Sequence, residues 1–310
     1  MDQLFINLLK TARPRQWIKN LTLFAALIFS GRLFLAKDFL TITLAVIIFS
    51  GITSSIYFLN DIIDVSRDKL HPFKKYRPIA SGKLPIPLAF FISVIGILIS
   101  FFLASKLNFF FFLLCLAYFI LQIIYSFLLK EIVIMDVVAI ALGFIIRIYA
   151  GAVILNYHVS SWFLLCVVST ALFFAVGKRR SEMTMLTTHE AASAHRKTLG
   201  KYSEVLLDAY LSMFATSAWI SWALFTFFES PPVILKPNFL YAFLPLTLSG
   251  SNKYLMLTIP LVIYGILRYL KIIYDGAWAE SPERVLLKDK PLLTTVVIWG
   301  IVLILVIYGS

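Results

Sequence analysis

The sequence predicts an all-α, polytopic membrane protein, a bundle of about nine transmembrane helices. Composition is the first reason. Hydrophobic residues make up 60% of the 310 residues, charged residues make up 14%, and the mean hydropathy is +0.90, whereas a soluble domain carries about a quarter charged residues. The second reason is that the apolar residues form runs of the ~20 residues needed to cross ~30 Å of hydrocarbon as a helix.

Nine apolar runs define the predicted spans, with a tolerance of about 2–4 residues at each end. They are 17–35, 38–60, 86–105, 109–129, 133–155, 160–177, 204–228, 254–273 and 292–309. Segment 239–248 is apolar but short, and it is interpreted as a re-entrant or interfacial piece. The residues before Trp17 predict a short amphipathic helix that leads into the first span. No repeat or low-complexity segment divides the chain, so we expect one membrane domain, 1–310.

Lysine and arginine residues predict the orientation. One set of span ends carries 22 of the 28 Lys and Arg residues, and the other set carries five. Arg147 completes the 28 and falls within a span. The positive-inside rule therefore places the N-terminus and the highly charged loops in the cytoplasm. The formal net charge of +12 does not indicate nucleic-acid binding, because the basic residues lie in short loops and suit anionic lipid and phosphorylated substrates.

The positions of the cysteines and histidines argue against a disulfide framework and against a histidine metal site. Cys115 and Cys166 each lie inside an apolar run, which is typical of small buried residues and not of a disulfide framework. The four histidines lack the spacing of a metal site.

The first candidate site is the charged stretch from Asn60 to Pro85, which follows the second span. On a helix, Asp61, Asp64 and Asp68 share one face, and Asn60 lies at its border. Three carboxylates together favour a divalent cation such as Mg²⁺, which takes one or two carboxylates, waters and phosphate oxygens. The bases that follow suit a ligand rich in phosphate. The alternative is a solvated loop in which acids and bases neutralise each other.

Five motifs in order resemble one branch of the UbiA-like intramembrane prenyltransferase superfamily, the decaprenyl-phosphate phosphoribosyltransferase branch. They are RPRQWIKN (13–20), NDIIDVSRDKLHPFKKYRPIASG (60–82), YSFLLKEIVIMDVVAIALGFIIRIYAGA (125–152), GKRRSE (177–182) and SPERVLLKDKPL (281–292). The resemblance implies a UbiA-like fold, in which the helices surround a cavity open to the cytoplasm. It also implies Mg²⁺-dependent transfer of a phosphoribosyl group. The donor would be 5-phosphoribosyl 1-diphosphate, the acceptor a polyprenyl phosphate, and pyrophosphate would leave. It also implies a bacterial plasma membrane and a role in making a lipid-linked pentose donor for cell-wall polysaccharides.

The motif GKRRSE differs from the corresponding part of ordinary UbiA-like enzymes. Those enzymes resemble each other in having a second Asp-rich motif on the loop after the sixth span. Lys178 and Arg179 stand there instead, with Glu182 following. One carboxylate cluster and one basic cluster suit a metal-bound diphosphate with further phosphates. This favours the phosphoribosyl reaction over the main alternative, transfer of an isoprenoid from its diphosphate to an aromatic acceptor. The other interpretation of GKRRSE is topology alone, with a local Lys178–Glu182 pair.

The third candidate region runs from Tyr125 to Gly151. On a helix, Asp136 and Arg147 lie on one stripe, and Arg147 would lie near mid-membrane, where a lone charge costs at least ~2.5–3.5 kcal/mol. Such residues line a cavity or form a buried ion pair or polar contact, and the sequence leaves both open. Lys130 could meet a phosphate or act as a topology anchor.

The expected roles follow from these motifs. Asp61, Asp64 and Asp68 are the expected metal ligands and, with Asp136, the expected catalytic residues. The expected substrate-binding residues are Lys19, Asn60, Lys75, Arg77, Tyr125, Lys130, Arg147, Lys178, Arg179 and Glu182. The sequence does not determine the oligomeric state, and a homo-oligomer is one of the alternatives. It disfavours a transporter, because its ionisable residues concentrate on one side.

Overall fold

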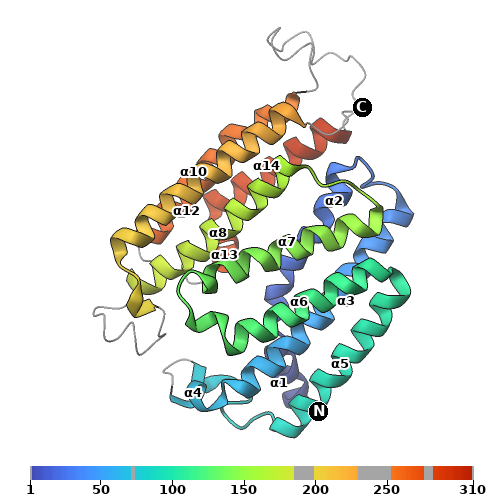
Figure 1. Ribbon diagram of the computed structural model, residues 1–310, viewed down its shortest axis with the longest axis vertical. Coiled ribbons are helices and arrows are strands. Elements are labelled where there is room, and N and C mark those ends of the chain that lie inside the picture. Colours follow the sequence, from blue (N-terminus) through green and yellow to red (C-terminus); the bar gives the residue numbers. More distant parts are fainter. Residues whose placement is uncertain (1, 71–73, 185–198, 230–252, 276–281, 309–310) are drawn as a thin grey trace. The chain divides into compact units, whose positions relative to one another are not determined.

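The computed structural model describes residues 2–70, 74–184, 199–229, 253–275 and 282–308, all of them helical or connecting (Figure 1). Eight helical segments in these residues are long and apolar enough to cross a membrane. They are α3 (Ala36–Ile63), α5 (Ile86–Leu107), α6 (Phe109–Phe127), α7 (Met135–Leu155), α8 (Ser161–Thr184), α10 (Glu204–Phe228), α12 (Ile259–Tyr274) with the 3-10 helix Tyr254–Thr258 before it, and α14 (Lys290–Tyr308). The predicted segment 239–248 lies outside the described residues.

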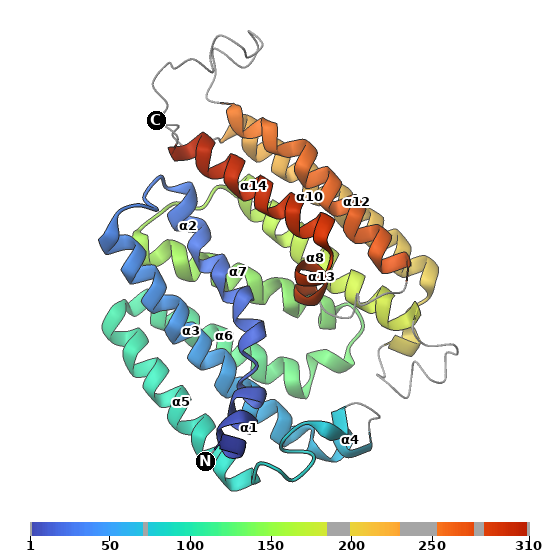
Figure 2. The same ribbon diagram turned by 180° about the vertical axis from the view of Figure 1, so that it is seen from behind.

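The first predicted span, 17–35, is not a single helix, so eight of the nine expected spans are found in the described residues. The chain forms a 3-10 helix, Pro14–Leu23, and then the short helix α2 (Phe24–Phe29). The polar residues Lys19 and Asn20 lie at the start of the predicted span, and the apolar run that remains is too short to cross a membrane as an α-helix. The 3-10 helix packs against α3 within the first part of the chain (Figure 2).

Shorter helices connect or precede the spans. The predicted N-terminal helix is found as α1 (Asp2–Ala12), and its outward side carries Leu4, Phe5 and Leu9. The others are α4 (Val65–Leu70), α13 (Pro282–Lys288) and the 3-10 helices Lys74–Tyr76, Leu129–Glu131 and Leu199–Lys201.

The chain divides into two compact units that interleave along the sequence. The first unit takes residues 1–25, 36–130 and 146–156, and the second takes 26–35, 131–145 and 157–310. Each has its own core: Phe49, Ile52, Phe111 and Cys115 belong to the first, and Phe173, Leu207, Leu211 and Ile273 to the second. Because the units interleave, no single cut in the chain separates them. The expected single domain and the expected cavity stay predictions.

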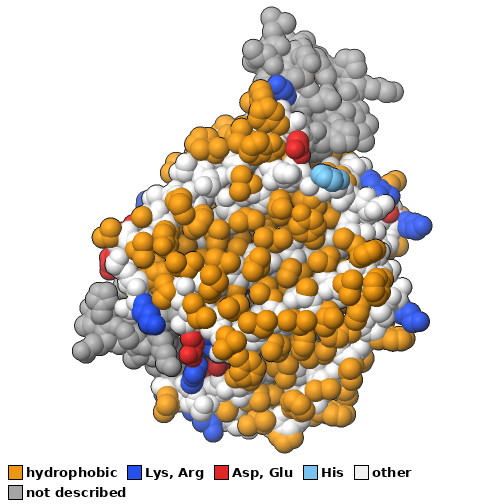
Figure 3. All heavy atoms as spheres, in the orientation of Figure 1, with side chains coloured by type: hydrophobic (Ala, Val, Ile, Leu, Met, Phe, Trp, Pro, Cys, Tyr) orange, Lys and Arg blue, Asp and Glu red, His pale blue; other side chains and the backbone are white. Residues whose placement is uncertain are grey.

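Outward faces of the helices are apolar, as lipid contact requires. On α5, for example, Phe90, Phe91, Leu98 and Phe102 are each more than half exposed. Figure 3 shows hydrophobic side chains over most of one face of the helices, with charged side chains towards its margins. The chain is therefore built as a multi-pass membrane protein.

Gly151 allows a close approach inside the first unit. A Cβ at Gly151 would overlap the backbone carbonyl of Leu23, whereas a Cβ at Gly300 on α14 would meet nothing within 4 Å. We expect Gly151→Ala to lower the free energy of unfolding by about 1–3 kcal/mol, because the backbone must shift to make room. Gly300→Ala should be neutral or stabilising by up to about 1 kcal/mol, through helix propensity alone. Denaturant unfolding of both variants in the same detergent checks this; equal effects would contradict it.

Candidate active site

The aspartates lie where α3 ends and α4 begins. Asp64 stands between the two helices, yet the backbone keeps helical spacing there: the Asp64 amide donates to the Asn60 carbonyl at 2.9 Å, and the Asp68 amide to the Asp64 carbonyl at 2.8 Å. This spacing turns Asp61 and Asp68 to the same side, as expected for residues seven apart. Both residues are buried, with 2% and 3% of their surface exposed.

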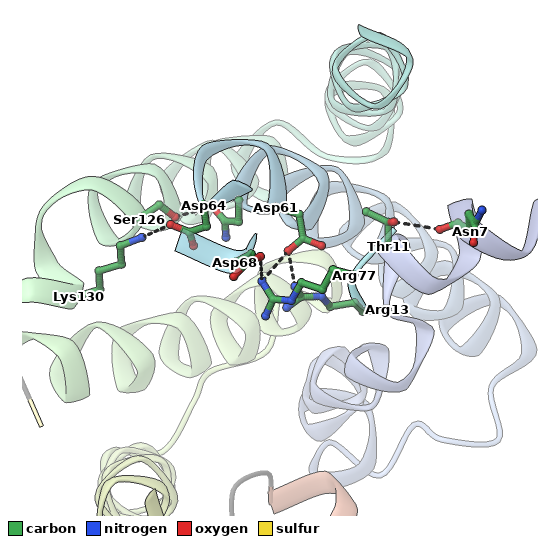
Figure 4. Close-up of polar contacts among 10 residues, drawn as sticks. Asn7, Thr11, Arg13, Asp61, Asp64, Asp68, Arg77, Ser126 and Lys130 are labelled. Atoms are coloured by element: carbon green, nitrogen blue, oxygen red, sulfur yellow. Dashed lines mark hydrogen bonds and ion pairs between the residues drawn. The ribbon is translucent and has the colours of Figure 1, made fainter. Parts of the chain in front are cut away.

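One guanidinium group joins the two buried aspartates. Arg77 Nη1 lies 3.1 Å from Asp61 Oδ1 and 2.7 Å from Asp68 Oδ2 (Figure 4). Arg77 reaches this point because the chain turns back after Tyr76, with the Arg77 amide donating to the Lys74 carbonyl at 2.9 Å. Charge-assisted contacts of this kind are stronger than neutral hydrogen bonds. The sequence-predicted residues Asp61, Asp68 and Arg77 are thus brought together.

Arg13 is a second cation at the same place, and it was not among the predicted site residues. Its guanidinium donates to Asp61 Oδ1 and lies over the Tyr57 ring, 4.7 Å from the centroid. Arg13 adopts a left-handed backbone conformation, with φ 52°, between α1 and the 3-10 helix. The only signal for it in the sequence was its place at the start of RPRQWIKN. Asp61 is therefore held between two arginines.

The third aspartate, Asp64, turns towards the 3-10 helix Leu129–Glu131 that follows α6. Lys130 Nζ lies 2.9 Å from Asp64 Oδ1, and one turn earlier Ser126 Oγ donates to Asn60 Oδ1 at 2.6 Å. Asn60 and Asp64 are four residues apart, as are Ser126 and Lys130, so the two contacts lie side by side. Asn60, Asp64 and Lys130 were predicted site residues; Ser126 was missed, although its neighbour Tyr125 was not. Tyr125 is itself half-buried on α6.

Asp61 and Asp68 form the part of this site whose donors suit Mg²⁺. The described residues contain no group of three or more Asp, Glu, His or Cys side chains gathered as metal ligands; Asp64, paired with Lys130, is the member that lies apart. The oxygens of Asp61 and Asp68 nevertheless converge on a single positively charged nitrogen. Mg²⁺ prefers such hard oxygen donors and commonly uses only one or two carboxylates. The residues therefore fit this ion.

The other predicted residues of the first unit divide into surface and interior. Lys75 is exposed, with its ammonium 5.2 Å from the Tyr76 ring centroid, and Lys19 is half-buried in the 3-10 helix. Arg147 is buried on α7, where its Nε donates to Asn20 Oδ1 at 2.9 Å and its Nη2 to the Tyr118 hydroxyl at 2.8 Å. The predicted mid-membrane cation thus has polar contacts from two other segments.

The motif GKRRSE continues α8 and does not form the expected loop. Its helical spacing buries Arg179 completely, and this residue pairs with Asp136 at 2.8 Å and with Glu182 at 2.9 Å. Asp136 is also fully buried. The structure thus brings together Asp136, Arg179 and Glu182, and both carboxylates form ion pairs with the one guanidinium group.

The neighbouring residues of GKRRSE make different contacts. Arg180 pairs with Asp208 at 2.7 Å and with Glu204 at 3.1 Å, which ties α8 to α10. Lys178 Nζ lies 3.9 Å from Glu182, and its side chain is 40% exposed. Lys178 is therefore the most exposed cation of this motif.

Tyr202 completes the Asp136 cluster and was not anticipated. Its hydroxyl donates to Asp136 Oδ1 at 2.9 Å and accepts the Ile134 amide at 2.8 Å. Ile134 has φ 71°, a strained conformation for a β-branched residue, so this contact helps to hold the start of α7. Nothing in the sequence linked this tyrosine to an aspartate 66 positions away.

We expect Tyr202 to make folding sensitive to alkaline pH. Burial raises the pKa of the Tyr202 hydroxyl to about 12, and the Asp136 charge adds to the rise. Because the folded pKa exceeds the unfolded value of about 10, this contribution is complete below pH ~10 and is lost as the pH rises towards ~12. Thermal unfolding between pH 9 and about 12 checks this. Tyr202→Phe should show a smaller fall in stability over that window; an equal fall would contradict the assignment.

The chain belongs to the UbiA prenyltransferase family, whose family model matches residues 21–288. It is also similar, over nearly its whole length, to decaprenyl-phosphate phosphoribosyltransferases. The one from Mycolicibacterium smegmatis is 33% identical over 301 residues, which cover 94% of this chain and 90% of the relative. The one from Corynebacterium glutamicum is 31% identical over 307 residues, which cover 97% and 87%.

A solved structure supports the fold. A UbiA homolog from Archaeoglobus fulgidus, bound to GPP and Mg²⁺, superposes with a TM-score of 0.64 at 21% identity and covers 97% of this chain and 96% of that one. The predicted all-α UbiA-like fold and the predicted family are confirmed.

Proposed function

We propose that this protein transfers the 5-phosphoribosyl group of 5-phosphoribosyl 1-diphosphate to a polyprenyl phosphate of the decaprenyl type. A lipid phosphate oxygen attacks C1 of the ribose, a new C1–O bond forms, and the bond from C1 to the diphosphate breaks. The electron pair leaves with pyrophosphate. Because the lipid phosphate is already anionic, the reaction needs no base from the protein.

The observation that carries this proposal is the near-full-length similarity to relatives that bear this activity in their names. The ionic residues of the first unit support it. Asp61, Asp68 and Arg77 offer carboxylate oxygens for Mg²⁺ beside a guanidinium for phosphate. A bound Mg²⁺ would supply charge stabilisation to the departing diphosphate.

The remaining predicted residues take supporting roles in this proposal. Lys75 and Lys178, both exposed to the surroundings, are proposed phosphate contacts. Arg179 is proposed to hold Asp136 and Glu182 in place, since its guanidinium pairs with both carboxylates. Lys19, Asn60, Tyr125, Lys130 and Arg147 remain proposed substrate-binding residues.

The location proposed is the bacterial plasma membrane, with the N-terminus and the aspartates on the cytoplasmic side. The Lys and Arg asymmetry supports this orientation. Water-soluble phosphoribosyl diphosphate would then approach from the cytoplasm, and the lipid from within the bilayer.

Mass spectrometry of the lipid product tests the proposal. Purified protein is given Mg²⁺ with phosphoribosyl diphosphate and polyprenyl phosphate, or with polyprenyl diphosphate and an aromatic acid. We expect a phosphoribosylated lipid from the first pair, absent with EDTA, and no product from the second. A prenylated aromatic product alone would assign the protein to isoprenoid transfer instead.

A further inference from the structure

The aspartates expected to bind metal are already neutralised by the protein's own cations. Asp61 contacts both Arg13 and Arg77, and Asp68 contacts Arg77. The two carboxylates are almost completely buried, whereas the two arginine side chains keep 29% and 27% exposure. The two arginine side chains, and not the two carboxylates, are therefore accessible to an incoming ligand.

Arg77 occupies the point where a metal ion would be held. Its Nη1 lies within 3.1 Å of one oxygen of Asp61 and one of Asp68, so a divalent ion bound by these oxygens would face a guanidinium at the same place. Like charges so close repel strongly. A metal ion arriving alone must displace Arg77 and leave it without its carboxylates.

A diphosphate removes the energetic cost of leaving Arg77 without an anionic partner. Arginine binds phosphate oxygens in a bidentate manner, with geometry similar to its carboxylate contacts. A diphosphate that arrives with the metal therefore gives Arg77, and Arg13 beside it, a replacement anion. The positive charges then stay paired on both sides of the exchange.

We propose that Arg77 is a specificity-determining residue that makes the Asp61–Asp68 pair accept a divalent cation together with a diphosphate and reject the cation alone. This inference rests on the proposed function, in which the diphosphate is that of phosphoribosyl diphosphate. Arg13 assists by offsetting the second charge on Asp61. By linkage, diphosphate tightens metal binding by the same factor as metal tightens diphosphate binding.

Equilibrium dialysis of the full-length protein in detergent, with Mn²⁺ as the metal and inorganic pyrophosphate as the diphosphate, tests this directly. The soluble Mn²⁺–pyrophosphate complex reaches the same concentration on both sides of the dialysis membrane. The excess of Mn²⁺ on the protein side is therefore the metal bound to the protein. For the unaltered protein we expect weak Mn²⁺ binding that pyrophosphate tightens by at least about tenfold, the scale of one charge-assisted contact.

Arg77→Gln should abolish the tightening of Mn²⁺ binding by pyrophosphate. Without the competing cation, Mn²⁺ alone should bind about tenfold more tightly, and pyrophosphate should no longer tighten it. Arg13→Gln should give a smaller rise, because Arg77 still bridges the pair; it carries the test if Arg77→Gln does not fold. Arg15→Gln changes an exposed arginine that lies two residues from Arg13 in the sequence. It is the matched control and should behave as the unaltered protein.

Unchanged or weaker binding of Mn²⁺ alone in both variants would overturn the inference. Neither sugar nor lipid is present in this measurement, so its result is independent of the transfer assay. Failure of phosphoribosyl transfer with intact metal–pyrophosphate coupling would refute the proposed function alone. Transfer without coupling would refute only the role of Arg77.

Discussion

Asp61→Asn is expected to lower kcat/KM for phosphoribosyl transfer by about 10²–10³-fold, a loss typical of removing one well-placed electrostatic group. Asparagine keeps the shape of the side chain but removes the charge that faces Arg13 and Arg77. The variant loses one of two converging carboxylates, so both metal affinity and diphosphate stabilisation fall. Initial rates at saturating lipid acceptor, with phosphoribosyl diphosphate varied, measure the effect.

The matched control for this substitution lies on the same helix. Asp38→Asn removes a carboxylate in the first turn of α3, at the end opposite Asp61. It should keep kcat/KM within about twofold of the unaltered protein, as substitutions away from a site usually do. An Asp61→Asn enzyme that also stays within that range would show that this carboxylate takes no part in the reaction.

Arg179→Met is expected to lower the free energy of unfolding by about 3–5 kcal/mol, the cost of removing one partner from a buried ion pair. Asp136 is fully buried, and without Arg179 its negative charge loses its guanidinium contact at 2.8 Å. Methionine fills a similar volume, so cavity formation contributes little. Denaturant unfolding in a single detergent measures the change.

A double-mutant cycle separates the ion pair from packing. Asp136→Asn in the Arg179→Met background removes the uncompensated charge and should restore part of the lost stability. Lys178→Met, a substitution at a side chain that is 40% exposed, should change stability by no more than about 0.5 kcal/mol. If the double variant is as unstable as the sum of the single ones, Asp136 and Arg179 do not stabilise each other.

Hydropathy was enough to predict most of the membrane helices. The observed bounds of α3, α5 and α6 lie within three residues of the predicted ones, because helix ends coincide with the ends of the apolar runs. It failed for 17–35, where polar residues occupy the start of the run. It also ended α8 too early, because hydropathy treats Arg179 as a loop residue although buried carboxylates keep it inside the helix.

Residue spacing predicted part of the candidate site. The seven-residue separation of Asp61 and Asp68 correctly placed them on one side of a helix. The contact of Arg13 with Asp61 and the contact of Tyr202 with Asp136 were not predictable, because both depend on segments far apart in sequence. Local periodicity carries no information on such contacts, which arise only when helices pack.

The fate of an ¹⁸O label tests the central claim most directly. Polyprenyl phosphate labelled in its non-bridging oxygens is incubated with the protein, Mg²⁺ and unlabelled phosphoribosyl diphosphate, and both products are analysed by mass spectrometry. Attack of the lipid phosphate on C1 predicts that all ¹⁸O stays in a phosphoribosylated lipid and that an equal amount of unlabelled pyrophosphate forms. Label in a released phosphate product, or a lipid that gains phosphate without ribose, would contradict phosphoribosyl transfer.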